Sequence, residues 1–327
     1  MRRTASGACM AAFLAAATAA QEPPQPDASF RPLDGRDLDA AVAAGDRRAL
    51  IAQALGAGAY EQAQALLAEE AQRNPKSPEL LRLLGGVFFM RREFLNSAIA
   101  FKKAEALAPL DERSRFTLAM SYVVLGRRDW ARPELLKLTQ AAPRSALYRY
   151  WTARLDYDDG KYAAAAEGLL QAIALDGRFV KAHDNLGLCY EALGRNDEAL
   201  RSYREAVRLN REASPGSPWP PLNLGLLLAR LDRLDEAEPL FRESVRLDGR
   251  FPPGHYQLGV TLEKKGRVEE AVEELEEAAR LDASYSEPQY ALARLYRRGG
   301  QAEKADRALQ RFLALKRQKG RAGPGPQ

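Results

Sequence analysis

A small residue returns along most of the chain at a fixed interval, and the apolar positions around it keep the same phase. Each step covers roughly 34 residues, a self-similar period that predicts a solenoid of helix–turn–helix units. Only the step from Gly187 to Gly225 is longer, by four residues. The small position is occupied by Gly85, Ala119, Ala153, Gly187, Gly225, Gly259 and Ala293.

Three further positions recur in phase with the small position. The turn position holds Gly58, Arg92, Gly126, Gly160, Gly194, Asp232, Gly266 and Gly300, so glycine fails only in two copies. The crossing position holds Ala63, Ser97, Ala131, Ala165, Ala199, Ala237, Ala271 and Ala305. The bulky position, four residues after the crossing position, holds Leu67, Phe101, Leu135, Leu169, Tyr203, Phe241, Leu275 and Leu309.

The stretch from Val180 to Asn210 shows what each position is expected to do. Gly187 lets two helices approach closely, and Gly194 turns the chain between them. Ala199 lies at the next close crossing, and Tyr203 belongs to the second helix. Because each unit packs only on its neighbours, a core of this kind grows with the number of units.

With these positions in phase over eight copies, the sequence resembles the tetratricopeptide repeat family. The resemblance implies an all-α fold, a right-handed superhelical solenoid of helix–turn–helix repeats with no strand. It also implies a non-catalytic scaffold that binds a protein or an extended peptide in the concave groove of the solenoid.

The chain divides into five predicted parts. Residues 1–20 form a signal peptide, and residues 21–37 form an extended or disordered linker. Residues 38–77 hold a short capping helix, expected at 38–44, and a degenerate terminal repeat, while residues 320–327 form a disordered tail. Seven repeats lie between them, at 78–111, 112–145, 146–179, 180–217, 218–251, 252–285 and 286–319.

The single longer step reflects four extra residues in the segment Arg211–Pro221. Its prolines and glycine predict a lengthened loop rather than a domain boundary. Trp219 lies in this segment and is expected to fold back over the neighbouring helix ends. The alternative is that Trp219 is an exposed contact residue.

The N-terminus predicts export. Arg2 and Arg3 precede an alanine-rich apolar run, Ala8–Ala20, that is too short to cross a bilayer and ends in small residues suited to cleavage. No other segment approaches the roughly 20 apolar residues of a transmembrane helix. We therefore expect a periplasmic or secreted protein whose mature chain begins near Ala20 or Gln21.

The charge is nearly balanced overall but uneven near the C-terminus. The net charge of +5 does not by itself suggest a nucleic-acid partner. The segment from Arg294 to Arg321 carries ten basic residues, opposed only by Glu303 and Asp306. We interpret this segment as a solvated outer helix face. The alternative is an envelope-associated structural protein that docks on an anionic surface, or on an acidic partner, through this basic end.

No motif for catalysis, for a metal or for a cofactor is found, so we predict neither an enzyme nor a bound cofactor. His183 and His255 both lie four residues before a small-position glycine and are expected to belong to the repeat scaffold. Loss of Cys9 with the signal peptide leaves Cys189 alone, which excludes an internal disulfide. Cys189 is expected to be a buried small residue.

The candidate binding residues lie two residues before the small position, about 200° around the helix from the close crossing. Three successive repeats carry amides there, which offer both a donor and an acceptor to the backbone of an extended partner. In the family this side faces the concave groove, and superhelical members use an asparagine ladder. The alternative is that asparagine is simply tolerated in this helix. The three amides are Asn185, Asn223 and Gln257.

Flanking positions, three residues before and one residue after the small position, supply further candidates. Tyrosine provides contact area at low entropic cost, and arginine can bind carboxylates. We expect these side chains to border the groove at the edges of the amide strip. They are Tyr150, Arg154, Tyr256, Tyr290 and Arg294.

Overall fold

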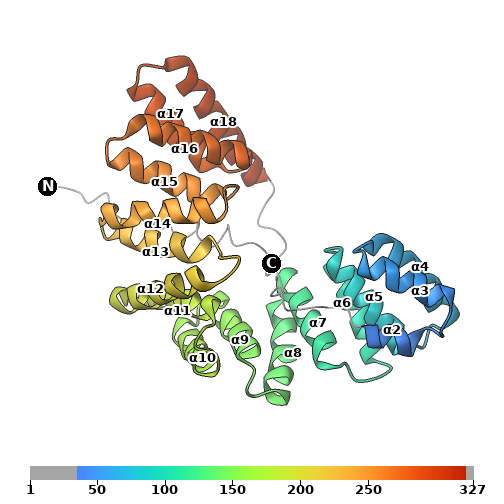
Figure 1. Cartoon of the computed structure of the whole chain (residues 1–327). Helices are drawn as coiled ribbons and strands as arrows, with labels where there is room; N and C mark the ends of the chain where they lie inside the picture. Colours follow the sequence, from blue (N-terminus) through green and yellow to red (C-terminus); the bar gives the residue numbers. More distant parts are fainter. Residues whose placement is uncertain (1–34, 322–327) are drawn as a thin grey trace. The chain divides into compact units, whose positions relative to one another are not determined.

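The computed structural model describes residues 35–321, all of whose regular elements are α-helices (Figure 1). This confirms the predicted all-α class. The predicted signal peptide, most of the predicted linker and residues 322–327 lie outside the described residues. The contacts divide the chain into two compact units, with the boundary between Leu155 and Asp156. No helix in the described part of the chain is long and apolar enough to span a membrane.

The first unit holds a capping helix and the first helix pairs. Its helices are α2 (Gly35–Ala41), α3 (Asp46–Gly56), α4 (Tyr60–Arg73), α5 (Pro78–Met90), α6 (Phe94–Glu105), α7 (Glu112–Val124), α8 (Arg128–Ala141) and most of α9 (Ala146–Asp158). Helix α5 begins in the expected way, since Ser77 accepts a bond from the Leu80 amide and Pro78 occupies the first turn.

The second unit continues the same alternation of first and second helices. Its helices are α10 (Tyr162–Leu175), α11 (Val180–Ala192), α12 (Asn196–Glu212), α13 (Trp219–Arg230), α14 (Leu234–Leu247), α15 (Pro252–Lys264), α16 (Val268–Leu281), α17 (Ser286–Arg298) and α18 (Ala302–Arg321).

Helix ends differ from the predicted boundaries at three places. Helix α2 covers residues 35–41, so part of the predicted linker is helical and the capping helix ends earlier than expected. The extra residues after Asn210 partly lengthen α12, which ends at Glu212, and Arg208 pairs with Glu212 along the added turn. Helix α18 extends to Arg321, so the predicted tail begins too early. Basic residues near the C-terminus of a helix are favourable there and offset the cost of one glycine.

The loop after α12 is closed by its own polar groups. The Asn210 side chain donates to the Ser217 carbonyl and accepts from the Ser217 amide, both at 2.8 Å. Trp219 then begins α13, with its ring 4.8 Å from that of Phe251 in an edge-on contact. Trp219 therefore folds back over the neighbouring helix ends as expected.

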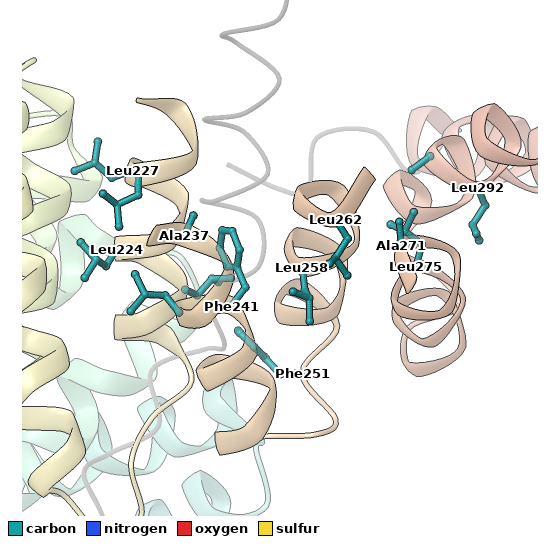
Figure 2. Close-up of a cluster of buried hydrophobic side chains, with 14 of the residues drawn as sticks. Leu224, Leu227, Ala237, Phe241, Phe251, Leu258, Leu262, Ala271, Leu275 and Leu292 are labelled. Carbon is teal, nitrogen blue, oxygen red and sulfur yellow. The ribbon is translucent and has the colours of Figure 1, made fainter. Parts of the chain in front are cut away.

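First helices stack more closely than second helices. In the second unit α11 contacts α13, α13 contacts α15, and α15 contacts α17, whereas α12, α14, α16 and α18 contact first helices only. The buried side chains of α13 to α17 form one continuous core between these layers (Figure 2). The first helices thus form an uninterrupted row along this unit.

The close crossing of each repeat joins the small position on its first helix to the bulky position on its second helix. A Cβ atom on Gly85 or Gly225 would lie 2.8 Å or 2.7 Å from the ring of its partner, Phe101 or Phe241, and a Cβ on Gly187 would overlap Tyr203 more closely still. Copies with alanine at the small position carry leucine at the bulky position. Three of the four glycine copies instead face an aromatic ring, so small and bulky volumes compensate.

This compensation makes a prediction for Gly187 and Tyr203. Gly187→Ala should lower the free energy of unfolding by about 1–3 kcal/mol, because its Cβ overlaps the Tyr203 ring. The double variant Gly187→Ala/Tyr203→Leu, which copies the alanine–leucine repeats, should lose less than the sum of its two single variants. Urea denaturation of all four proteins measures the coupling, and strictly additive losses would contradict it.

The turn position adopts the same backbone in every copy, including the two without glycine. The glycines there have φ between 69° and 80°, while Arg92 has 62° and Asp232 has 60°. This left-handed region is unfavourable for residues with a Cβ. Arg92 and Asp232, where the glycine pattern is interrupted, therefore form the same turn with a strained backbone.

Replacing the strained residues with glycine should stabilise the protein. We expect Arg92→Gly to raise the free energy of unfolding by about 0.5–1 kcal/mol, and Asp232→Gly by less, since aspartate tolerates this region better. The reverse change, Gly194→Ala, is the matched control and should destabilise by a similar amount. Urea midpoints would test the order, and a stabilising Gly194→Ala would refute it.

Candidate partner-binding surface

The three predicted amides lie on consecutive first helices, but two of them are not exposed. Asn185 on α11 and Asn223 on α13 retain 6% and 7% of their accessible surface, whereas Gln257 on α15 is half-buried. Of the three amides predicted to bond a partner backbone, only Gln257 is therefore accessible, because Asn185 and Asn223 are buried. The neighbouring first helix covers this side of the helix, which the periodicity of one helix does not reveal.

Asn223 instead bonds to the preceding repeat. Its Nδ2 donates to Asp184 Oδ2 at 2.9 Å, joining α13 to α11 inside the stack. A buried carboxylate is costly unless it is hydrogen-bonded, so this amide stabilises the junction of two repeats.

The flanking candidates divide between the two units. Tyr150 and Arg154 lie on α9 in the first unit, where Tyr150 is buried with its ring 5.3 Å from that of Trp151 and Arg154 is half-buried. The remaining candidates belong to the second unit. The structure therefore does not join the first two to the others within one unit.

Arg294 pairs with Glu263, whereas the ring of Tyr256 packs against that of Tyr285, with 5.2 Å between ring centres. Arg294 Nη2 lies 2.5 Å from Glu263 Oε2, which places α17 against α15. Burial, followed by the nearby carboxylate of Glu287, raises the pKa of Tyr256 to about 12, and the charge of Arg294 acts in the opposite direction. Tyr290, by contrast, is 50% exposed and packs against Phe312.

Glu263 belongs to a repeated ion pair that was not among the predicted residues. Glu263 Oε1 lies 3.3 Å from Arg298 Nη1, and Glu191 Oε2 lies 2.5 Å from Arg230 Nη2. Each glutamate lies four residues after a small position, and each arginine lies five residues after the next one. This shared phase is the signal that could have predicted the pairs. Burial raises the pKa of Glu191, and Arg230 offsets this only in part.

Apolar side chains lie between the two ion pairs. Leu226 on α13 and Val260 on α15 share the position one residue after the small position, and both are partly exposed. Arg294 has the same position on α17. We call the surface of Leu226, Tyr256, Val260 and their flanking Glu–Arg pairs the first-helix face. Its middle is apolar and both ends carry charge.

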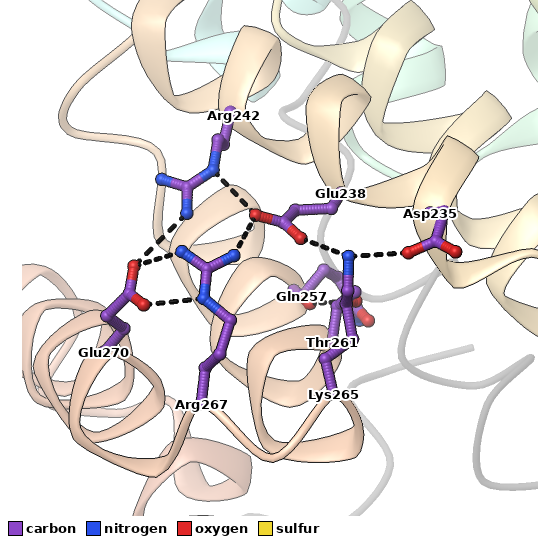
Figure 3. A network of polar contacts seen from close by, with 8 residues as sticks. All are labelled: Asp235, Glu238, Arg242, Gln257, Thr261, Lys265, Arg267 and Glu270. Atoms are coloured by element: carbon purple, nitrogen blue, oxygen red, sulfur yellow. Dashed lines mark hydrogen bonds and ion pairs between the residues drawn. The ribbon is translucent and has the colours of Figure 1, made fainter.

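A second polar network links α14, α15 and α16 around Glu238 (Figure 3). Burial alone would raise the pKa of Glu238, but its three cationic partners lower it to about 2. The carboxylate bonds Lys265, Arg267 and Arg242 at 2.8, 2.6 and 3.0 Å. Every charge in this network is matched, so we interpret it as a junction between repeats.

The histidines and the cysteine take scaffold positions. His183 Nε2 lies 3.0 Å from the Gly177 carbonyl oxygen, and His255 Nε2 lies 3.2 Å from that of Gly249. Both rings thus bind the carbonyl six residues earlier, at the turn between repeats. Cys189 is fully buried on α11, as expected.

About half of the basic C-terminal segment is neutralised by neighbouring carboxylates. Pairs join Arg294 and Arg298 to Glu263, Arg297 to Asp306, Arg307 to Glu303 and Lys316 to Glu287. The free positive charge of this segment is therefore smaller than the sequence suggested.

Helix pairs stacked through a small-to-bulky crossing define a helix–turn–helix repeat solenoid. Sequence models described as tetratricopeptide repeat match residues 48–112, 116–177 and 222–286, residues 178–250, and residues 290–322. The chain therefore belongs to the tetratricopeptide repeat family. No curated protein matches the sequence.

Solved structures of similar fold share little sequence with the chain. Yeast Tom70 is 16% identical with a TM-score of 0.60, over 93% of this chain and 68% of that one. PilF of Pseudomonas aeruginosa is 21% identical with a TM-score of 0.56, over 66% and 93%. PilW, described as a type IV pilus biogenesis factor, is 18% identical with a TM-score of 0.55, over 62% and 92%. At these identities the likeness supports the fold alone.

The different surroundings of the amides predict different mutational effects. Asn223→Ala removes a buried donor from Asp184 and should lower the free energy of unfolding by about 1–3 kcal/mol. Gln257→Ala should change it by less than about 0.5 kcal/mol, because the side chain is half-exposed on a helix. Chemical denaturation of the two single variants tests this. Equal losses would show that burial does not distinguish the two amides.

Proposed function

We propose that this chain is a non-catalytic interaction scaffold that binds a protein or extended peptide along its first-helix face. The observation that carries the proposal is the row of first helices in the second unit. Their side chains form a strip with an apolar middle and charged ends, instead of a uniformly charged outer surface. Apolar contact with charged flanks is a common basis for specific recognition.

The chemistry of the strip favours a particular kind of segment. Leu226 and Val260 suit an apolar side chain of the partner, and Tyr256 adds a ring beside them. Arg294 and Arg298 share one carboxylate, Glu263, so a partner carboxylate can bind there without leaving a cation unpaired. Gln257 is the one predicted amide that can bond a partner backbone while the stack stays intact.

The test compares partners retained by matched variants. Immobilised wild-type protein, Val260→Asp and Leu170→Asp are incubated with the same native lysate, and retained proteins are quantified by mass spectrometry. Leu170 is 47% exposed on second helix α10, so its variant adds the same charge away from the strip. Wild-type protein and Leu170→Asp should retain the same partners. The retained amount of these partners should be at least roughly tenfold lower for Val260→Asp.

A second variant separates loss of binding from loss of folding. Arg298 is 63% exposed, and glutamine at this position can still donate to Glu263, so Arg298→Gln should keep the wild-type melting temperature while weakening the same partners. The same retained proteins for both strip variants and the wild type would place the binding surface elsewhere.

We also propose that the mature protein acts outside the cytoplasm. The support is the short apolar run after Arg2 and Arg3, followed by small residues before Gln21. N-terminal sequencing of the protein from its native host should give a start near Ala20 or Gln21 in an exported fraction. An intact Met1 in a cytosolic fraction would refute export.

A further inference from the structure

The last repeat differs from the others at its bulky position. In seven copies the bulky side chain is fully buried, but Leu309 on α18 is only partly buried. Each second helix from α10 to α16 contacts the first helix of the following repeat, whereas α18 contacts only α17 among the helices of the second unit. The covered copies are Leu67, Phe101, Leu135, Leu169, Tyr203, Phe241 and Leu275.

An apolar surface is open where a following first helix would pack. Leu313, four residues after Leu309, is 44% exposed, while Val207 at the same repeat position retains 3% beneath α13. Tyr290 is 50% exposed and its ring lies 5.2 Å from that of Phe312. We call Tyr290, Leu309, Phe312 and Leu313 the end face.

The repeats themselves indicate what shape covers such a surface. At the earlier junctions of the second unit a first helix lies against the equivalent residues, as α13 does on α12 and α17 does on α16. The last repeat has the same small and crossing residues as the earlier ones, Ala293 and Ala305, so the end face has a similar shape to the surfaces that first helices cover. A helix is therefore the element whose shape matches it.

The charges around the end face select the kind of helix. Lys316 Nζ lies 5.7 Å from the Phe312 ring centre, and Arg294 Cζ lies 5.9 Å from that of Tyr290. Both side chains are about half-exposed, and each also pairs with one carboxylate, Arg294 with Glu263 and Lys316 with Glu287. Arg317 is exposed and makes no ion pair with a described residue. Two copies of this face would bring like charges together, which disfavours a symmetric dimer.

We propose that the end face binds an amphipathic helix of a partner protein, with acidic residues flanking its apolar side. The helix takes the place of a following first helix. Its apolar side covers Leu309, Phe312 and Leu313, and its carboxylates approach Lys316 and Arg317. This surface is separate from the first-helix face and does not depend on the function proposed for it.

The experiment measures binding of two labelled synthetic peptides by fluorescence anisotropy. Both are helices of roughly 20 residues with the same leucine and alanine side, flanked by glutamate in one and by lysine in the other. The full chain should bind the acidic peptide at least about tenfold more tightly than the basic one, with an affinity that falls as salt is added.

Matched variants locate the site. Leu313→Glu should weaken the acidic peptide at least about tenfold, and Arg317→Glu should weaken it less. Leu170→Glu, at a similarly exposed leucine on α10, should bind as the wild type does. Val260→Asp should also leave peptide binding unchanged, which distinguishes this surface from the first-helix face. Because Leu313 and Arg317 are exposed, all of these end-face variants should keep the wild-type melting temperature.

Three results would overturn the proposal. Equal affinity for the acidic and basic peptides would show that the face does not select acidic helices. Unchanged binding by Leu313→Glu would show that the peptide binds elsewhere. A concentration-dependent dimer in sedimentation experiments, lost in Leu313→Glu, would show that a second copy of the chain covers the end face.

Discussion

The close crossing between the small and bulky positions is the contact on which the rest of the structure depends. It sets the distance between the two helices of a repeat, as Gly187 against Tyr203 illustrates. The next first helix then packs over both helices and buries the bulky side chain completely. A change in one crossing therefore alters the surface on which the following repeat packs. Repeats with glycine mostly place an aromatic ring opposite it, and repeats with alanine place leucine there. The two combinations fill the crossing similarly, so the distance between the helices stays similar along the stack.

Polar contacts between repeats depend on this stacking and serve a second purpose. The Asn223–Asp184 bond and the Glu–Arg pairs at Glu191 and Glu263 each join one first helix to the next. Their directional geometry complements the non-directional apolar core and favours one register between repeats. The charged pairs also lie at the ends of the first-helix face, so a partner that recognises them contacts the groups that hold neighbouring repeats together.

The two proposed surfaces follow from two different features of a solenoid. The first-helix face exists because consecutive first helices adjoin, so it extends over several repeats and suits an extended segment. The end face exists because each repeat covers the preceding one and α18 has no such cover within the second unit. Its contacts are those of the core itself, and for that reason a helix fits it.

The sequence by itself determined the repeat fold, because its positions are close in the chain and recur in phase. Gly187 and Tyr203 belong to adjacent helices of one repeat, and the turn keeps its backbone even where Arg92 or Asp232 replaces glycine. Only the tertiary structure decided which polar groups are exposed. The burial of Asn185 and Asn223 depends on the neighbouring repeat, whose distance along the chain exceeds the reach of helical periodicity. The Glu–Arg pairs and the uncovered Leu309 likewise depend on contacts between repeats or on their absence.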